Sequence, residues 1–156
     1  MAKVEVVSGS ILDAKEQYIV HQANCISSYS RGLAAQIFQK WPETNIYSTT
    51  TTTNSGTVPG TVRVPGTIIV RNNVIALLAQ KYPGRATRTD DSSAQRLLWF
   101  RQCLQFVSKL KPETIAVPYN IGCGLAGGLW KDYWAEIKIW AHSLPLGTIV
   151  RVYQHQ

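Results

Sequence analysis

The chain has 156 residues, of which 45% are hydrophobic and 16% charged, a size and composition typical of one globular domain and not of a disordered chain. No run approaches the roughly 18 apolar residues that a membrane span needs, and the start Met1–Glu5 lacks the basic and apolar regions of a secretory signal. We therefore expect one domain over residues 1–156, a monomer without a membrane partner, that is intracellular, in the cytoplasm or the nucleus.

Charge and cysteine content narrow the classes of partner and of site. The formal charge of +7 attracts phosphate-bearing partners such as nucleotides or nucleic acid, but Lys and Arg are scattered, so charge alone selects none of them. Cys25, Cys103 and Cys123 form neither an even set nor a CxxC pair, which favours a reducing compartment and excludes a typical zinc motif. No carboxylates or histidines cluster at ligand spacing, so we expect no metal and no cofactor.

The N-terminal part of the chain predicts a strand, loop and helix unit. Lys3–Val7 alternates in polarity and ends at the turn residues Ser8–Ser10, and Tyr18–Asn24 is a second strand candidate. In Leu33–Trp41 apolar residues recur at helical spacing, and Pro42 follows as a stop.

The middle of the chain predicts a loop followed by short strands. The Thr-rich stretch Ser48–Gly56 is interpreted as an exposed loop. Strand-like runs follow at Thr61–Val64, Thr67–Val70 and Val74–Ala79, and Asn72-Asn73 suits a tight turn between the last two.

The C-terminal part alternates helix and strand. Asp90–Ser93 offers N-cap residues for a helix that continues to Lys109-Leu110. Thr114–Pro118 is a nearly continuous apolar run, typical of a strand buried on both faces, and a helix from about Lys131 to His142 and a strand over Thr148–Val152 follow. This order predicts an α/β fold.

Two loops that follow apolar strands are candidates for a ligand site, because open α/β sheets bind ligands at such positions. The glycines of Ile121–Gly128 allow close approach of backbone N–H groups to a diphosphate; the alternative is a tight turn without a ligand. In the first loop, Asn24 could hold two ribose hydroxyls or could cap its own turn. Arg31-Gly32-Leu33-Ala34-Ala35 follows at a helix start.

Three segments carry a resemblance to a known family: His21–Cys25, Arg31–Ala34 and Ile115–Trp130. In them the chain resembles macrodomains, most closely the small ADP-ribose 1″-phosphate phosphatase type and next the terminal ADP-ribose protein glycohydrolase type. The resemblance covers nearly the whole chain, and the last segment is its most specific part. It implies a three-layer α/β/α sandwich with a mixed central sheet.

The resemblance also implies ligand positions. Ser10 and Ile11 would lie near the adenine and Asn24 near the distal ribose. Gly32-Leu33-Ala34 would lie along the diphosphate, and Gly122–Gly127 around the diphosphate and distal ribose. The full set of implied ligand-binding residues is Gly9, Ser10, Ile11, Asn24, Arg31, Gly32, Leu33, Ala34, Tyr119, Asn120, Ile121, Gly122, Cys123, Gly124, Leu125, Ala126 and Gly127.

The chain departs from the family pattern where chemistry is expected. Ser10 stands where members often carry an Asp that accepts a hydrogen bond from adenine, and Leu129 stands where the phosphatase branch often has Asp. The glycohydrolase branch uses a Lys and an Asp, and the matching positions here are Gln80, with Lys81 adjacent, and Ala126. The Lys–Asp mechanism is therefore incomplete.

His21 and Asn24 are the catalytic candidates. His21 matches a His of the phosphatase type and could act as a general acid or base; the alternative is a buried strand histidine with a packing role. Cys123 is not expected to be a nucleophile, because no histidine lies near it in sequence. The expected function is binding of ADP-ribose or a derivative, with dephosphorylation of ADP-ribose 1″-phosphate as the first choice of reaction. The alternatives are removal of ADP-ribose from modified protein or nucleic acid and non-catalytic reading of ADP-ribose.

Overall fold

The computed structural model describes residues 2–47, 50–53, 56–59 and 62–155. Within these residues six strands form one sheet in the order β1-β8-β7-β2-β6-β5, with all neighbours parallel except β5 and β6. The strands of this sheet are β1 (Lys3–Ser8), β2 (Tyr18–Asn24), β5 (Ile68–Arg71), β6 (Val74–Gln80), β7 (Thr114–Pro118) and β8 (Ile149–Gln154). The parallel strands confirm the expected α/β class and mixed sheet.

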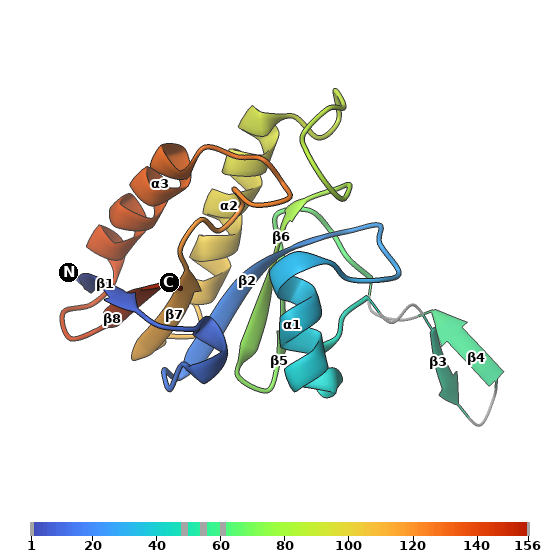
Figure 1. Ribbon diagram of the computed structural model, residues 1–156, viewed down its shortest axis with the longest axis horizontal. Coiled ribbons are helices and arrows are strands. Elements are labelled where there is room, and N and C mark those ends of the chain that lie inside the picture. Colours follow the sequence, from blue (N-terminus) through green and yellow to red (C-terminus); the bar gives the residue numbers. More distant parts are fainter. Residues whose placement is uncertain (1, 48–49, 54–55, 60–61, 156) are drawn as a thin grey trace.

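Helices cover both faces of the sheet (Figure 1). The helix α1 (Gly32–Lys40) packs on one face, and α2 (Ser93–Ser108) and α3 (Trp130–Ser143) pack on the other. Two short 3₁₀ helices, η1 (Ile11–Asp13) and η2 (Pro42–Thr44), lie on either side of the β2 and α1 unit in the chain. The expected three-layer sandwich is therefore confirmed.

The strand β6 shows why the sequence folds into layers. All seven of its residues are buried. Ile75, Leu77 and Ala79 belong to the core under α2 and α3, whereas the alternate residues Val74, Ala76 and Leu78 belong to the core under α1. Because side chains alternate across a strand, a continuous apolar run is what a sheet covered on both faces requires.

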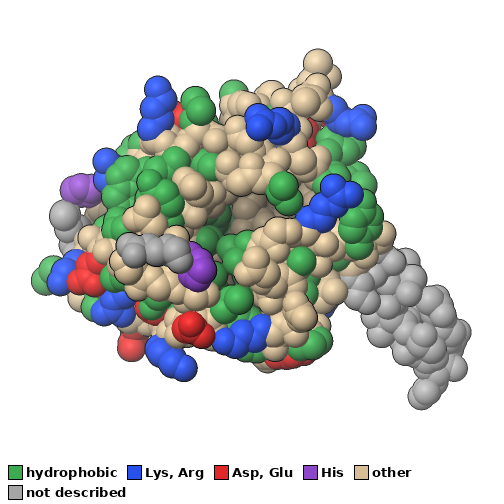
Figure 2. Space-filling view, viewed as in Figure 1, with side chains coloured by type: hydrophobic (Ala, Val, Ile, Leu, Met, Phe, Trp, Pro, Cys, Tyr) green, Lys and Arg blue, Asp and Glu red, His purple; other side chains and the backbone are tan. Residues whose placement is uncertain are grey.

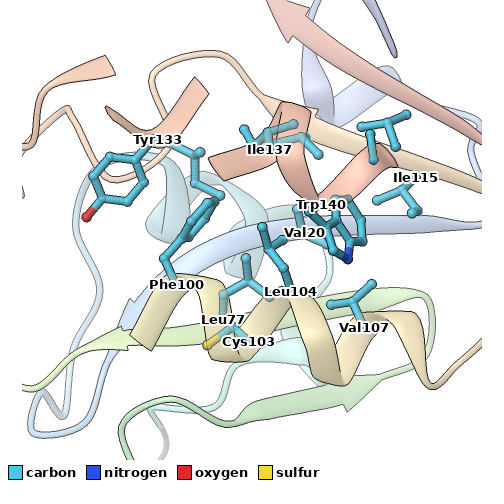
Figure 3. Packing of buried hydrophobic residues seen from close by; sticks show 14 of the residues in the cluster. Val20, Leu77, Phe100, Cys103, Leu104, Val107, Ile115, Tyr133, Ile137 and Trp140 are labelled. Atoms are coloured by element: carbon cyan, nitrogen blue, oxygen red, sulfur yellow. The ribbon is translucent and has the colours of Figure 1, made fainter. Parts of the chain in front are cut away.

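The larger core lies between the sheet and the α2 and α3 layer. Figure 3 shows Phe100, Leu104 and Val107 of α2 facing Ile137 and Trp140 of α3, with the strand residues alongside. Phe100 and Ile137 have no exposed surface, so this core fixes α3, and with it the Gly-rich loop that enters α3.

Several predicted turns and caps are confirmed. Ser92 is the N-cap of α2, and its side chain accepts the backbone N–H of Gln95 at 3.1 Å. Asn72-Asn73 joins β5 to β6, since Arg71 pairs with Val74 across the turn. Asn72 has a φ of 54°, a conformation that asparagine tolerates better than most residues.

Two predictions for the middle of the chain are wrong. The Thr-rich stretch is not only a loop: β3 (Thr50–Thr53) pairs antiparallel with β4 (Gly56–Pro59), and this hairpin stands away from the sheet in Figure 1. Threonine is β-branched and favours extended backbone, so a Thr run suits a strand as well as a loop. Residues 48–49 and 54–55 of the predicted loop lie outside the described residues.

The predicted strand Thr61–Val64 does not form over its described part. Val62–Val64 has no strand pairing. Pro65 cannot donate to a ladder, and the N–H of Thr67 bonds to the carbonyl of Val64 at 3.2 Å, which turns the chain just before β5. Thr61 lies outside the described residues. No helix among the described residues is long and apolar enough to cross a membrane.

Candidate functional site

A cavity of about 510 Å³ lies at the carboxyl ends of β2, β6 and β7. The segments after these strands supply much of its wall: residues 32–34 after β2, residues 83–84 after β6, and most of residues 119–126 after β7. Figure 2 shows the hollow near the middle of this face. This main cavity is lined by His21, Gln22, Ala23, Asn24, Gly32, Leu33, Ala34, Tyr47, Gln80, Pro83, Gly84, Pro118, Tyr119, Asn120, Ile121, Gly122, Gly124, Leu125 and Ala126.

Two smaller pockets adjoin the main cavity and extend it into a cleft. The outer pocket, about 370 Å³, shares Leu33, Pro118, Tyr119 and Asn120 with the main cavity and adds Ser10, Ile11, Gln36, Tyr153, Gln154 and His155. The end pocket, about 200 Å³, shares Asn24, Tyr47, Pro83 and Gly84 with the main cavity and adds Ser27, Tyr29 and Arg31. The main cavity therefore lies between the other two.

Most residues implicated by the sequence line this cleft. Those on the main cavity are His21, Asn24, Gly32, Leu33, Ala34, Tyr119, Asn120, Ile121, Gly122, Gly124, Leu125 and Ala126; Ser10 and Ile11 line the outer pocket, and Arg31 lines the end pocket. Their contact with a ligand remains a prediction.

Three of the implicated residues, Gly9, Cys123 and Gly127, line none of the three cavities. The thiol of Cys123 faces the carbonyl of Ile121 at 3.3 Å, and burial raises its pKa to about 11, so it is not an activated nucleophile. Gly127 has a φ of 74°, which favours glycine, and a Cβ there would lie 2.9 Å from the side chain of Arg85.

Sequence reasoning did not assign the cavity residues Gln22, Ala23, Tyr47, Pro83, Gly84 and Pro118 to the site, and it considered Gln80 only as the counterpart of a lysine. Strand alternation would direct Gln22 and Ala23 to opposite faces. The pairing of β2 with β6 shifts register between Gln22 and Asn24, and the consecutive residues from His21 to Asn24 all line the cavity. No local signal marks Tyr47, because it reaches the site only through the tertiary fold.

The Gly-rich loop leaves backbone donors for a ligand. Among the described residues, the N–H groups of Gly122, Gly124, Leu125 and Ala126 have no acceptor in the protein, and all four residues line the main cavity. Clustered backbone N–H groups of this kind bind anions. A Cβ at Gly124 would meet nothing within 4 Å, so the backbone there is openly accessible.

Other glycines in the loop serve packing against α3. A Cβ at Gly122, which has a φ of 76°, would lie 2.5 Å from the ring of Tyr133, and a Cβ at Gly128 would lie 2.6 Å from the carbonyl oxygen of Gly122. These two glycines let the loop lie directly on α3. The run of glycines thus combines packing positions with the open position at Gly124.

The loop that leads into α1 and the Gly-rich loop meet across the cleft. The Cδ1 atom of Leu125 lies 3.2 Å from the place that a Cβ on Gly32 would take, and Gly32 has a φ of 57°. Leu125 lines the main cavity although 63% of its surface is exposed. A side chain at position 32 would press on the tip of Leu125 and would be strained by the positive φ.

A buried ion pair holds the walls of the main cavity. The guanidinium of Arg96 donates to both carboxylate oxygens of Asp91, at 2.8 and 2.7 Å, and to the carbonyls of Gly84 at 2.7 Å, Tyr82 at 3.2 Å and Ala126 at 3.4 Å. Burial works to raise the pKa of Asp91, but the hydrogen bonds from Arg96 and from the backbone N–H of Tyr82, together with the charge of Arg96, outweigh it and keep the pKa below its usual value. One cation therefore ties together the loops that carry Gly84 and Ala126.

His21 is a neutral, buried histidine in the cavity wall. It is 1% exposed and packs edge-to-face against Phe38, with ring centroids 5.4 Å apart. Burial lowers its pKa to about 4. Neither ring nitrogen has a hydrogen-bond partner among the described residues. Near neutral pH, His21 is therefore a neutral ring and not a charged general acid.

Asn24 caps its own turn. Its Oδ1 accepts the backbone N–H groups of Ile26 at 3.0 Å and Ser27 at 2.8 Å, and its Nδ2 donates to the hydroxyl of Tyr47 at 3.1 Å. The capping alternative is the one that the structure shows. A role for Asn24 at a ribose stays a prediction, and it is limited to one remaining N–H.

The main cavity has no charged side chain among its described lining residues. At the lysine position of the glycohydrolase pattern, Gln80 accepts from the side chain of Gln22 at 2.8 Å, while Lys81 pairs with Asp90 at 2.9 Å and lines none of the cavities. Leu129 is 60% exposed and also lies outside them. The site can bind through neutral donors, and it lacks a paired Lys and Asp.

No protein-family model matches the chain, and no curated protein matches it in sequence. Solved structures do match it in fold. The macrodomain of Thermus aquaticus DarG is 19% identical, with a TM-score of 0.66 over 99% of both chains, and that of Mycobacterium tuberculosis DarG is 20% identical, with a TM-score of 0.69 over 98% of both. DarTG of Thermosipho africanus in complex with ADP-ribose is 13% identical and matches 98% of this chain and 42% of that one, with a TM-score of 0.62. The chain therefore has the macrodomain fold.

Replacing Arg96 tests the role of the buried ion pair. We expect Arg96→Gln to lower the free energy of unfolding by about 3–5 kcal/mol, because the carboxylate of Asp91 would remain buried without its partner. Arg101→Gln is the matched control: Arg101 pairs with Glu136 but is 56% exposed, so the loss should stay below about 1 kcal/mol. Urea unfolding measures the free energy of unfolding of both variants. Equal losses would show that the buried Arg96–Asp91 pair stabilises the fold no more than the exposed Arg101–Glu136 pair does.

The low pKa of His21 predicts a pH dependence of stability. The folded-state pKa of about 4 lies below the ordinary 6.5, so below pH 6.5 the unfolded state binds a proton that the folded state does not. Stability should fall by roughly 3 kcal/mol as the pH drops from 6.5 to 4. This part of the loss should vanish in His21→Gln and persist in His142→Gln, whose histidine is exposed. A His21 ring that titrates near 6.5 by NMR would contradict the burial argument.

Proposed function

We propose that this protein of macrodomain fold binds ADP-ribose or a derivative along the cleft. The observation that carries the proposal is the set of four backbone N–H groups from Gly122 to Ala126 without protein acceptors, beside a cavity with no acidic side chain among its described lining residues. A diphosphate supplies acceptor oxygens and negative charge to such a site.

The shape of the cleft fits the parts of the same ligand. The adenine would occupy the outer pocket near Ser10 and Ile11, the diphosphate would lie in the main cavity, and the distal ribose would point toward Asn24. The hydroxyl oxygen of Ser10 is a neutral hydrogen-bond acceptor for the adenine, although it already accepts the backbone N–H of Leu12 at 3.2 Å. The structurally similar DarTG of Thermosipho africanus is a complex with ADP-ribose, which supports the choice of ligand.

The reaction that we propose first is removal of phosphate from ADP-ribose 1″-phosphate. It is favoured by His21, which lines the main cavity as a neutral ring and whose two buried ring nitrogens have no partner among the described residues. Removal of ADP-ribose from protein or nucleic acid has less support, because Gln80 and Ala126 replace the Lys and Asp of that pattern. With His21 inactive, the same cleft would serve a non-catalytic reader.

Calorimetric titration with ADP-ribose tests the binding proposal. Wild-type protein should bind, and Gly124→Val should weaken binding at least about tenfold, the equivalent of 1.4 kcal/mol, because its side chain would enter the open space beside the cavity. The free energy of unfolding should change by no more than about 0.5 kcal/mol. Ala135→Val, at an exposed position of α3, is the control. No heat and no thermal stabilisation by ADP-ribose would refute the proposal.

Phosphate release from ADP-ribose 1″-phosphate tests the reaction. Wild type should release phosphate, and His21→Ala should reduce kcat by about 10²-fold or more if His21 assists the attacking water. His142→Ala should leave the rate unchanged. Binding without turnover would favour the reader, turnover that survives His21→Ala would remove the role of His21, and loss of ADP-ribose from labelled protein or DNA would favour the glycohydrolase alternative.

A further inference from the structure

The end pocket beyond Asn24 has a chemistry of its own. At about 200 Å³ it is smaller than the roughly 300–1,000 Å³ of pockets that enclose whole ligands, so it suits a small group carried by a larger ligand. It opens from the main cavity at Asn24 and Tyr47, which line both. A ligand whose distal ribose lies at Asn24 would direct a substituent into it.

Tyr47 presents an unused hydrogen-bond donor at this junction. Its hydroxyl oxygen accepts the backbone N–H of Asn24 at 2.9 Å and the Nδ2–H of Asn24 at 3.1 Å. The orientation of the Asn24 amide is fixed, because its Oδ1 accepts two backbone N–H groups, which cannot reverse their polarity. The phenol therefore keeps only its own proton to share, and no described residue accepts that proton.

The position of Tyr47 is held firmly. It is 4% exposed, its ring packs edge-to-face on Phe38 with centroids 5.6 Å apart, and the guanidinium of Arg63 lies 5.0 Å from its ring centroid. Burial raises the pKa of Tyr47 above its ordinary value, so the hydroxyl stays protonated. A buried donor without an acceptor is costly unless a ligand supplies the acceptor.

The charges around the end pocket are positive. Arg31 lines it and donates to the hydroxyl of Tyr29 at 3.1 Å, and Arg63 donates to the backbone carbonyl of Asn24 at 3.2 Å. No Asp or Glu is among the described residues that line it. Donors and cations without acidic groups select a small anion with several acceptor oxygens and disfavour an ammonium group.

We propose that the end pocket is an anion subsite for a phosphate monoester on the distal ribose, with Tyr47 and Arg31 as the residues that distinguish this ligand from unsubstituted ADP-ribose. The proposal rests on the proposed function, because it assumes that the distal ribose lies at Asn24. Tyr47 donates one neutral hydrogen bond to a phosphate oxygen, and Arg31 supplies charge-assisted ones.

The test compares ADP-ribose with its 1″-phosphonate analogue, which cannot lose its phosphorus group by hydrolysis. By calorimetry the wild type should bind the phosphonate at least about tenfold more tightly than ADP-ribose. In Tyr47→Phe and in Arg31→Gln this ratio should fall toward about one. Tyr133→Phe is the matched control, since Tyr133 is 3% exposed and lines none of the three cavities, and it should keep the wild-type ratio.

A second readout separates the subsite from the proposed function. Inorganic phosphate, titrated at constant ionic strength, should shift the amide NMR signals of Ile26 and Ser27 in the wild type but not in Arg31→Gln. Because Arg31 is exposed, this variant should fold, and it can be used for the test even if Tyr47→Phe does not fold. Phosphate shifts without ADP-ribose binding would uphold the subsite and refute the proposed function. ADP-ribose binding with a ratio near one and no phosphate shifts would overturn the subsite alone.

Discussion

The ligand cleft depends on the buried hydrogen bonds and ion pair that Arg96 makes. The side chain of Arg96 is 3% exposed, and it meets a carboxylate that is 1% exposed together with carbonyls from two loops. Such a pair is expensive to bury and is often no more stable than apolar packing would be. Its effect here is positional: one rigid, planar donor group fixes Gly84 and Ala126 on their two walls. The width of the main cavity follows from that geometry.

In this cleft, the groups suited to bind a ligand are distinct from the side chain that could take part in a reaction. Its middle offers backbone N–H groups and neutral side chains, which suit a diphosphate without needing a lysine or arginine in contact with it. The positive charge lies instead at the end pocket, with Arg31. His21 lies in the wall as a neutral ring, so the site is better equipped to hold an anionic ligand than to protonate one. This ordering of charge favours binding of an anionic ligand, and a reaction on that ligand would depend on His21.

The sequence predicted the features that have local causes. Apolar runs marked the buried strands, Ser92 marked the start of α2, and the glycines between Ile121 and Gly128 marked the loop at the main cavity. The glycines could not show which residues face the ligand: Gly124 is open, whereas Gly127 packs on Arg85. Tyr47 could not be found at all, because its role comes from hydrogen bonds to Asn24, a residue 23 positions away. The Thr run was misjudged because its residues favour strands and occur in loops.

A crystal structure of the complex with ADP-ribose would show directly how the ligand groups are arranged along the cleft. We expect the adenine beside Ser10 and Ile11, phosphate oxygens within hydrogen-bond distance of the N–H groups of Gly124 and Leu125, and the C1″ atom facing Tyr47. A ligand bound in the reverse direction, or outside the cleft, would show that this arrangement is wrong.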